Sequence, residues 1–122
     1  YNGWTPEDSL EQHRFTVDWF HRCVPMLRGR VIMMTHHAPS TKSIHGRYKA
    51  SMGMYSSDME SFITKNPNIT HWISGHCHHS NDYMIGDCRM ISNPRGYDGY
   101  ELNPAYKPNF SFEVDRLPTV AL

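Results

Sequence analysis

The sequence predicts an α/β fold, and three observations favour it. An apolar run at residues 31–34 is typical of a buried strand, and a second run at 69–73 has the same character. Between them, residues 55–63 carry apolar side chains at helical spacing, and residues 57–60 have the pattern of a capping box. The order strand, helix, strand favours a parallel pair of strands joined by a crossover.

A long helix is predicted near the start of the chain. Residues 5–8 offer a hydroxyl N-cap, a proline for the first helical position and acidic side chains for the first turn. An apolar stripe then continues to about Val24, and Pro25 ends the helix. We expect His13 and His21, which lie on this helix, to be surface or boundary residues and not ligands.

The last third of the chain predicts short strands and loops. Residues 83–85 and 88–91 are typical of a hairpin, since Gly86-Asp87 between them is a favoured two-residue turn. We expect a loop at 98–107, which is rich in proline, glycine and tyrosine. Apolar and polar side chains alternate at 110–114, which predicts a final edge strand with one buried face.

Composition excludes some classes of protein. The 122 residues suffice for at most one domain, and no apolar run approaches the roughly 20 residues that span a bilayer. The formal net charge is zero, so no basic field argues for nucleic acid or an anionic membrane as partner. The three cysteines are few and odd in number, which argues against a disulfide framework. This favours a reducing compartment such as the cytoplasm.

The most informative stretch is Gly75-His76-Cys77-His78, directly after the second predicted strand. Histidines two residues apart point to the same side of an extended segment, so we expect both rings to face one cavity. In such a segment the side chain of Cys77 points the other way. Clustered neutral imidazoles are suited to binding metal ions.

A second pair of histidines, His36-His37, follows the strand predicted at 31–34. Ala38-Pro39 comes next, and proline cannot continue a strand in the middle of a sheet. The carboxyl ends of parallel strands meet at one edge of a sheet, where ligands bind in α/β proteins. Five of the nine histidines fall in these two places, which predicts a metal site built by both strand ends.

Three segments together resemble a known family. Residues 35–40 (THHAPS), the Gly75-His76-Cys77-His78 block and residues 93–97 (NPRGY) are similar to the carboxyl-terminal half of the calcineurin-like metallophosphoesterases. That family hydrolyses phosphoesters with a dinuclear metal centre, in a β-sandwich flanked by helices. The resemblance implies that His76 and His78 are metal ligands and that a third comes from His36-His37. The common H-x-P form favours His37, and His36 stays open.

Departures from the family pattern limit what the chain can do by itself. The blocks D-x-H and G-N-H-[DE] are missing, and Gly86-Asp87-Cys88-Arg89-Met90 lacks the second aspartate of G-D-x-x-D. The bridging carboxylates and the histidine beside the leaving group are therefore not on this chain, and its catalytic residues stay unknown. We interpret residues 1–122 as the carboxyl-terminal portion of a single domain whose amino-terminal half, a required partner, is missing.

The resemblance implies two divalent ions, Mn²⁺, Fe, Zn²⁺ or Mg²⁺, and a phosphoester substrate. The loop at 40–54 follows the first histidine pair, so its cations are candidates for substrate contact, above all His45 and Arg47. The alternative is a metal-binding or scaffolding module of the same fold without catalysis. A structural zinc site of His76 and His78 with Cys77 or Cys88 is a weaker form of this alternative.

Overall fold

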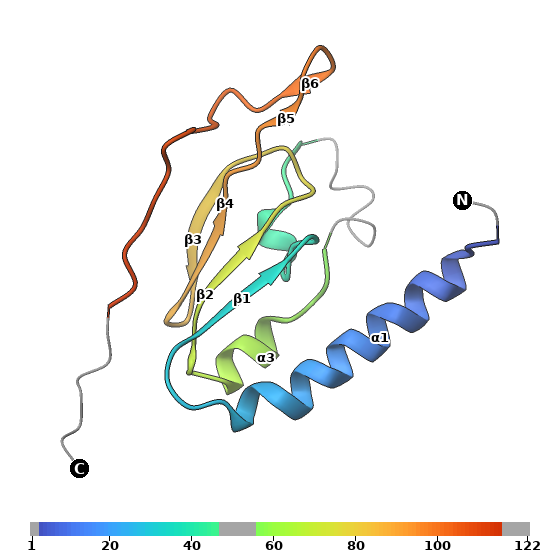
Figure 1. Cartoon of the computed structure of the whole chain (residues 1–122), viewed down its shortest axis with the longest axis vertical. Coiled ribbons are helices and arrows are strands. Elements are labelled where there is room, and N and C mark those ends of the chain that lie inside the picture. The colour runs from blue at the N-terminus through green and yellow to red at the C-terminus, as the bar shows by residue number, and fades with distance from the viewer. Residues whose placement is uncertain (1–2, 47–55, 116–122) are drawn as a thin grey trace.

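The computed structural model describes residues 3–46 and 56–115 and confirms an α/β fold (Figure 1). A four-stranded sheet has the strands β1 (Val31–Thr35), β2 (Ile69–Ser74), β3 (Asn81–Ile85) and β4 (Cys88–Ser92). Their order is β1-β2-β4-β3, in which β1, β2 and β4 are parallel and β3 is antiparallel to β4. The parallel pair and the hairpin predicted from the sequence are thus both confirmed.

The first helix, α1 (Pro6–Cys23), begins as predicted. Thr5 accepts a hydrogen bond from the backbone N–H of Asp8, and the Asp8 carboxylate accepts one from the backbone N–H of Thr5. These two bonds satisfy amide groups that the first helical turn leaves without partners. A 3₁₀ turn, η1 (Val24–Met26), ends the helix at its proline.

The core lies on the face of the sheet that α1 and α3 (Glu60–Lys65) cover (Figure 1). Trp72 in β2 pairs with Met33 on one side and Met90 on the other, and all three side chains are buried. Phe20 of α1 meets the Trp72 ring edge-on at 6.2 Å between centroids. Apolar burial on this face fixes which side chains of each strand point inward.

The capping box predicted at 57–60 does not form. Helix α3 begins at Glu60, and its N-cap residue Met59 makes no side-chain cap. The Glu60 carboxylate instead accepts hydrogen bonds from the Ser40 hydroxyl at 2.6 Å and the Lys42 ammonium at 3.1 Å. Tertiary contacts with the loop after β1 therefore outcompete the local cap. Tyr55, expected on this helix, lies outside the described residues.

A further prediction that was wrong concerns residues 110–114, which form no strand. The predicted alternation of burial is present, since Phe110, Phe112 and Val114 are half-buried between exposed neighbours. The Phe112 ring stacks on His71 at 5.2 Å and lies 5.7 Å from the Arg89 guanidinium. Ring contacts with side chains of β2 and β4, and not backbone pairing, thus hold this segment on the second face of the sheet.

The predicted loop at 98–107 contains part of a small ribbon. Strands β5 (Gly96–Tyr97) and β6 (Glu101–Leu102) pair antiparallel. Gly96 makes the ribbon possible, because its φ is +84° and a Cβ there would overlap the carbonyl oxygen of Glu101. The ribbon lies beyond the carboxyl-terminal ends of β2 and β4 (Figure 1).

Two expectations concern the whole architecture. The described residues form one four-stranded sheet and the ribbon, so they do not themselves make the expected sandwich. None of the helices in the described ranges is long and apolar enough to cross a membrane.

The ribbon gives a test of this arrangement. We expect Gly96→Ala to lower the free energy of unfolding by more than Gly99→Ala. Both positions are left-handed, at φ +84° and +72°, which costs an alanine about 1–2 kcal/mol. Only Gly96 has backbone in the way, since nothing lies within 4 Å of a Cβ at Gly99. Equal losses in denaturant unfolding would contradict the close approach of β5 and β6.

Candidate metal centre

The loop after β1 is fixed to the core by one chain of hydrogen bonds. The buried Trp72 indole N–H donates to the Thr35 hydroxyl at 2.9 Å, and this hydroxyl donates to the carbonyl of His37 at 2.7 Å. The indole has to find a partner because it is buried. The same contacts hold the backbone that carries His36 and His37.

The loop after β2 is tied to the first loop. The backbone N–H of Gly75 donates to the carbonyl of His36 at 3.0 Å. His76 then adopts φ +61°, and among the described residues it is the one non-glycine with a left-handed backbone. The segment from His76 to His79 is bent, so the expectation of an extended segment was wrong.

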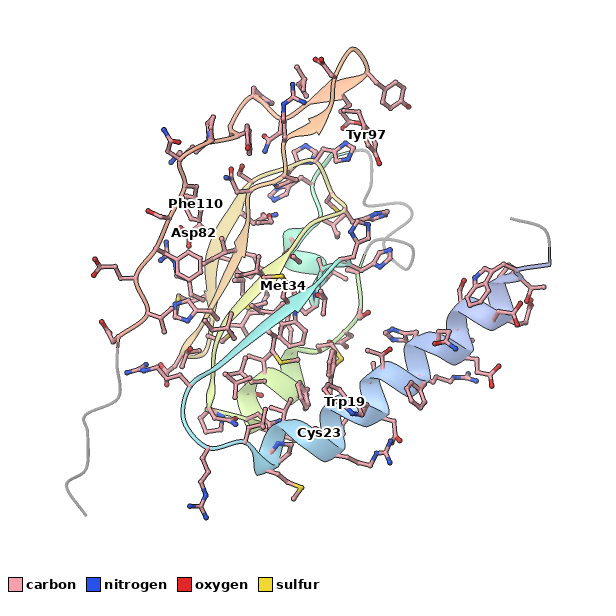
Figure 2. The ribbon with its side chains drawn as sticks, in the orientation of Figure 1. Trp19, Cys23, Met34, Asp82, Tyr97 and Phe110 are labelled. Carbon is pink, nitrogen blue, oxygen red and sulfur yellow. The ribbon has the colours of Figure 1, made fainter. Side chains whose placement is uncertain are left out.

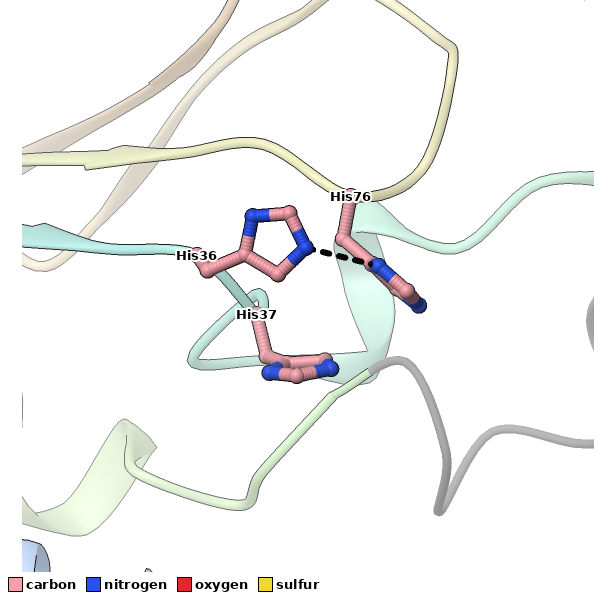
Figure 3. Close-up of side chains that lie close together, drawn as sticks. All are labelled: His36, His37 and His76. Carbon is pink, nitrogen blue, oxygen red and sulfur yellow. Dashed lines mark hydrogen bonds between the residues drawn. The ribbon is translucent and has the colours of Figure 1, made fainter. Parts of the chain in front are cut away.

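Three histidines converge where the two loops meet (Figure 3). We call His36, His37 and His76 the histidine cluster. Each offers a ring nitrogen, and these nitrogens all lie within 4.8 Å of one another. His36 Nε2 and His76 Nδ1 share a hydrogen bond of 2.9 Å, and the rings of His37 and His76 are 4.4 Å apart at their centroids. The structure thus brings together both candidates from the first loop and one from the second.

The geometry of the histidine cluster fits a single metal ion. Zinc binds imidazole nitrogens at about 2.0–2.1 Å in a tetrahedron, which separates two such nitrogens by about 3.3 Å. The observed separations, from 2.9 Å to at most 4.8 Å, bracket this value. Three histidines would leave a fourth position open to water or a ligand, as in catalytic zinc sites.

The surroundings of His37 and His76 favour the neutral form of both rings. Burial lowers the pKa of His37, and the neighbouring His36 and His13 lower it further. Burial also lowers the pKa of His76, together with His37, His36 and His78. The neighbouring rings thus disfavour a positive charge on His37 and on His76, and an imidazole must be neutral to bind a metal.

His78 lies outside the histidine cluster. Its ring packs edge-on against Tyr97 of the ribbon at 4.7 Å between centroids. Its Nδ1 is buried without a hydrogen-bond partner, and the nearest carboxylate oxygen, Oε2 of Glu101, is 3.8 Å away. His78 is still near enough to lower the pKa of His76. It is therefore a neighbour of the cluster and not a fourth member.

Of the two predicted substrate contacts, the structure describes His45, whose hydrogen bond and ring contact are with residues outside the histidine cluster. His45 bonds the side-chain oxygen of Asn81 through Nε2 at 2.6 Å, and its ring lies 5.5 Å from that of His79. Arg47 lies outside the described residues. His71 is half-buried in β2 and stacks on Phe112.

The cysteines do not join the histidines. Cys23, Cys77 and Cys88 are free thiols. Cys77 is buried with Ala38 and Ile44, which confirms that its side chain points away from the histidines. Burial raises the pKa of Cys77 and raises that of Cys88 to about 11, and neither thiol is part of the group of possible metal ligands among the described residues.

A groove of about 1000 Å³ opens beside the histidine cluster. We call it the α1 groove, because residues of α1 line one side and the end of β1 with its loop lines the other. His36 and His37 are part of its wall, as is His13. His13 is exposed, as predicted, and its spacing of three from Leu10 and four from Val17 puts it on the apolar stripe of the helix.

Comparison of this chain with models of protein families, with curated proteins and with solved structures finds no match. Its likeness to the metallophosphoesterases thus rests on the three sequence segments alone.

Protonation of the cluster predicts how stability depends on pH. The pKa values of His37 and His76 are lowered in the folded protein, so below about pH 6.5 the unfolded chain binds more protons than the folded one. The free energy of unfolding of metal-free protein should therefore fall between pH 7 and pH 5. The double variant His37→Gln, His76→Gln should flatten this fall, and His45→Gln should not. If the free energy of unfolding fell equally in the parent, the double variant and His45→Gln, protonation of His37 and His76 would not be the cause of the fall.

The hydrogen-bond chain predicts a second effect. Thr35→Val leaves the buried Trp72 indole without an acceptor, which should lower the free energy of unfolding by about 1–3 kcal/mol and weaken zinc binding. Thr64→Val is the matched control, since the exposed Thr64 hydroxyl bonds only Ser61 of its own helix. Denaturant titrations and zinc calorimetry measure both effects. An unchanged free energy of unfolding and unchanged zinc affinity in Thr35→Val would show that these hydrogen bonds do not position the loop.

Proposed function

We propose that this chain forms part of a metal-dependent phosphoester hydrolase, a phosphomonoesterase or phosphodiesterase, in which the histidine cluster supplies metal ligands. One observation carries the proposal. His36 and His37 come from one strand end and His76 from another, and their ring nitrogens gather within 4.8 Å. The two places are the two that resemble metallophosphoesterase blocks.

The proposed cofactor is a pair of divalent ions, of Mn²⁺, Fe, Zn²⁺ or Mg²⁺. Bound ions of this kind polarise a phosphoryl oxygen and lower the pKa of water, which promotes attack on phosphorus. The histidine cluster suits one ion. His78 is the candidate ligand for the other, because its buried Nδ1 has no hydrogen-bond partner and an imidazole nitrogen readily binds a metal. The bridging carboxylates belong to segments outside this chain.

The rest of the domain is the proposed partner. Strand β1 stands at the edge of the sheet, where its outer backbone groups are open to pairing. Ile32 of β1 is exposed as well, whereas Met34, 74% exposed and labelled in Figure 2, lines the α1 groove. Further strands from the amino-terminal half could pair along β1 and complete the expected sandwich.

The proposed reaction needs few groups from this chain. A water oxygen forms a bond to phosphorus, the bond from phosphorus to the leaving oxygen breaks, and the leaving group departs with one proton of that water. His36, His37 and His76 would hold a metal ion in position. The hydrogen bonds of Thr35 fix the loop that carries His36 and His37. Precise placement of such groups accounts for much of catalysis in phosphoryl transfer.

A metal-binding or scaffolding module of the same fold is the alternative. The observation that favours it is the composition of the cluster, which holds three histidines and no carboxylate among the described residues. Such a module would bind zinc through the cluster and would not turn over a phosphoester.

Hydrolysis of 4-nitrophenyl phosphate and bis(4-nitrophenyl) phosphate by the full-length protein tests the proposal. Turnover should need Mn²⁺ or Zn²⁺ and cease with a chelator. His76→Ala should lower kcat/KM about 100-fold or more, since even groups that only support ligands are worth about 10–100-fold.

His21→Ala is the matched control, as it removes an exposed histidine of α1 that does not line the groove. It should leave kcat/KM within about twofold of the parent, as surface substitutions normally do. Metal binding through the cluster without turnover would favour the module. Equal activity of the His76→Ala protein would remove the histidine cluster from the mechanism.

A further inference from the structure

The α1 groove has no ionised residue in its described wall. None of its lining residues is Asp, Glu, Lys or Arg. The larger apolar side chains that line it are those of Leu10, Val17, Phe20, Met34, Met59 and Trp72, and Pro6, Ala38 and Pro39 line it as well. Its polar wall consists of hydroxyls, an amide and the three histidines His13, His36 and His37. The groove is therefore a largely apolar surface that starts at the histidine cluster.

The lysine nearest in sequence to this wall offers no free positive charge. Lys42 lies on the loop that follows β1, and its ammonium is 3.1 Å from the Glu60 carboxylate. A second hydrogen bond joins Glu60 to Ser40. This network pairs the Lys42 ammonium with a carboxylate, so Lys42 does not supply the groove with an unpaired positive charge.

We infer that the α1 groove binds the leaving group of the phosphoester and selects one that is uncharged and apolar, such as an aryl or alkyl group. The inference rests on the proposed function, which places the phosphoryl group at the histidine cluster. His36 and His37 belong to both the cluster and the groove wall, so a group attached to that phosphoryl group extends into the groove.

Physical chemistry supports this selection. A phosphate or carboxylate on the leaving group would lose water in the groove and meet no Lys or Arg among the described residues of its wall, which is costly. An aromatic ring there would bury its own surface and that of Leu10 and Met34, both of which are now exposed. The volume of about 1000 Å³ is at the upper end of ligand pockets and admits a group larger than a single ring.

Binding tests the groove without any turnover. In calorimetry with the full-length protein and Zn²⁺, phenylphosphonate should bind about tenfold more tightly than methylphosphonate, because only the phenyl ring reaches apolar surface. Leu10→Lys should abolish this preference. Phe15→Lys should retain it, since Phe15 is an exposed apolar residue of α1 outside the groove wall. Equal affinities for the two phosphonates would overturn the inference, and they are the result expected if another part of the protein fills the groove.

Turnover separates the inference from the proposed function. 4-nitrophenyl phosphate should give a kcat/KM about tenfold or more above that of 3-carboxy-4-nitrophenyl phosphate, whose leaving group carries an added charge. Leu10→Lys should narrow this ratio by giving the carboxylate a partner. Equal rates for both esters in the parent and in Leu10→Lys would overturn the groove assignment and leave the hydrolase standing. Absence of any metal-dependent hydrolysis, with the phenyl preference intact, would overturn the hydrolase and keep the apolar binding site.

Discussion

The parallel pairing of β1 with β2 is the constraint on which the candidate site depends. Its register sets Thr35 beside Ser74, so both strands end at the same level. The next residues of both chains must then leave the sheet side by side. The bond from the Gly75 N–H to the His36 carbonyl extends this pairing by one step beyond the sheet. Histidines far apart in sequence become neighbours because two strands stop together.

Regular elements and the position of the site could be predicted from sequence. Periodicity gave the long helix and the strands, and turn chemistry gave the hairpin, because local spacing and local turns determine these features. The meeting of His36, His37 and His76 followed from one rule, that carboxyl ends of parallel strands share an edge. The role of each histidine in binding metal stays a prediction.

What sequence did not predict depends on contacts across the fold. The left-handed backbone at His76 separates it from His78, and no pattern in a G-H-x-H segment marks such a turn. Glu60 leaves its capping role for Ser40, twenty residues away. The segment of Phe112 lies against His71 without strand pairing. In each case a distant partner wins over a local preference, as tertiary context often does.

The long helix has a role beyond covering the core. Its carboxyl-terminal half packs through Phe20 on Trp72, the same tryptophan whose N–H holds Thr35. Its amino-terminal half instead forms one wall of the α1 groove, with His13 on the side of the cluster. Helix α1 therefore packs on the tryptophan that holds the loop of His36 and His37, and it also forms one wall of the α1 groove.

The central claim is that His36, His37 and His76 share one metal ion. The most direct measurement is an anomalous difference map at the zinc edge from crystals of the full-length protein grown with Zn²⁺. We expect one peak at about 2.0–2.2 Å from a ring nitrogen of each histidine. The absence of a peak at these three histidines, with the hydrogen bond between His36 and His76 still in place, would contradict the claim.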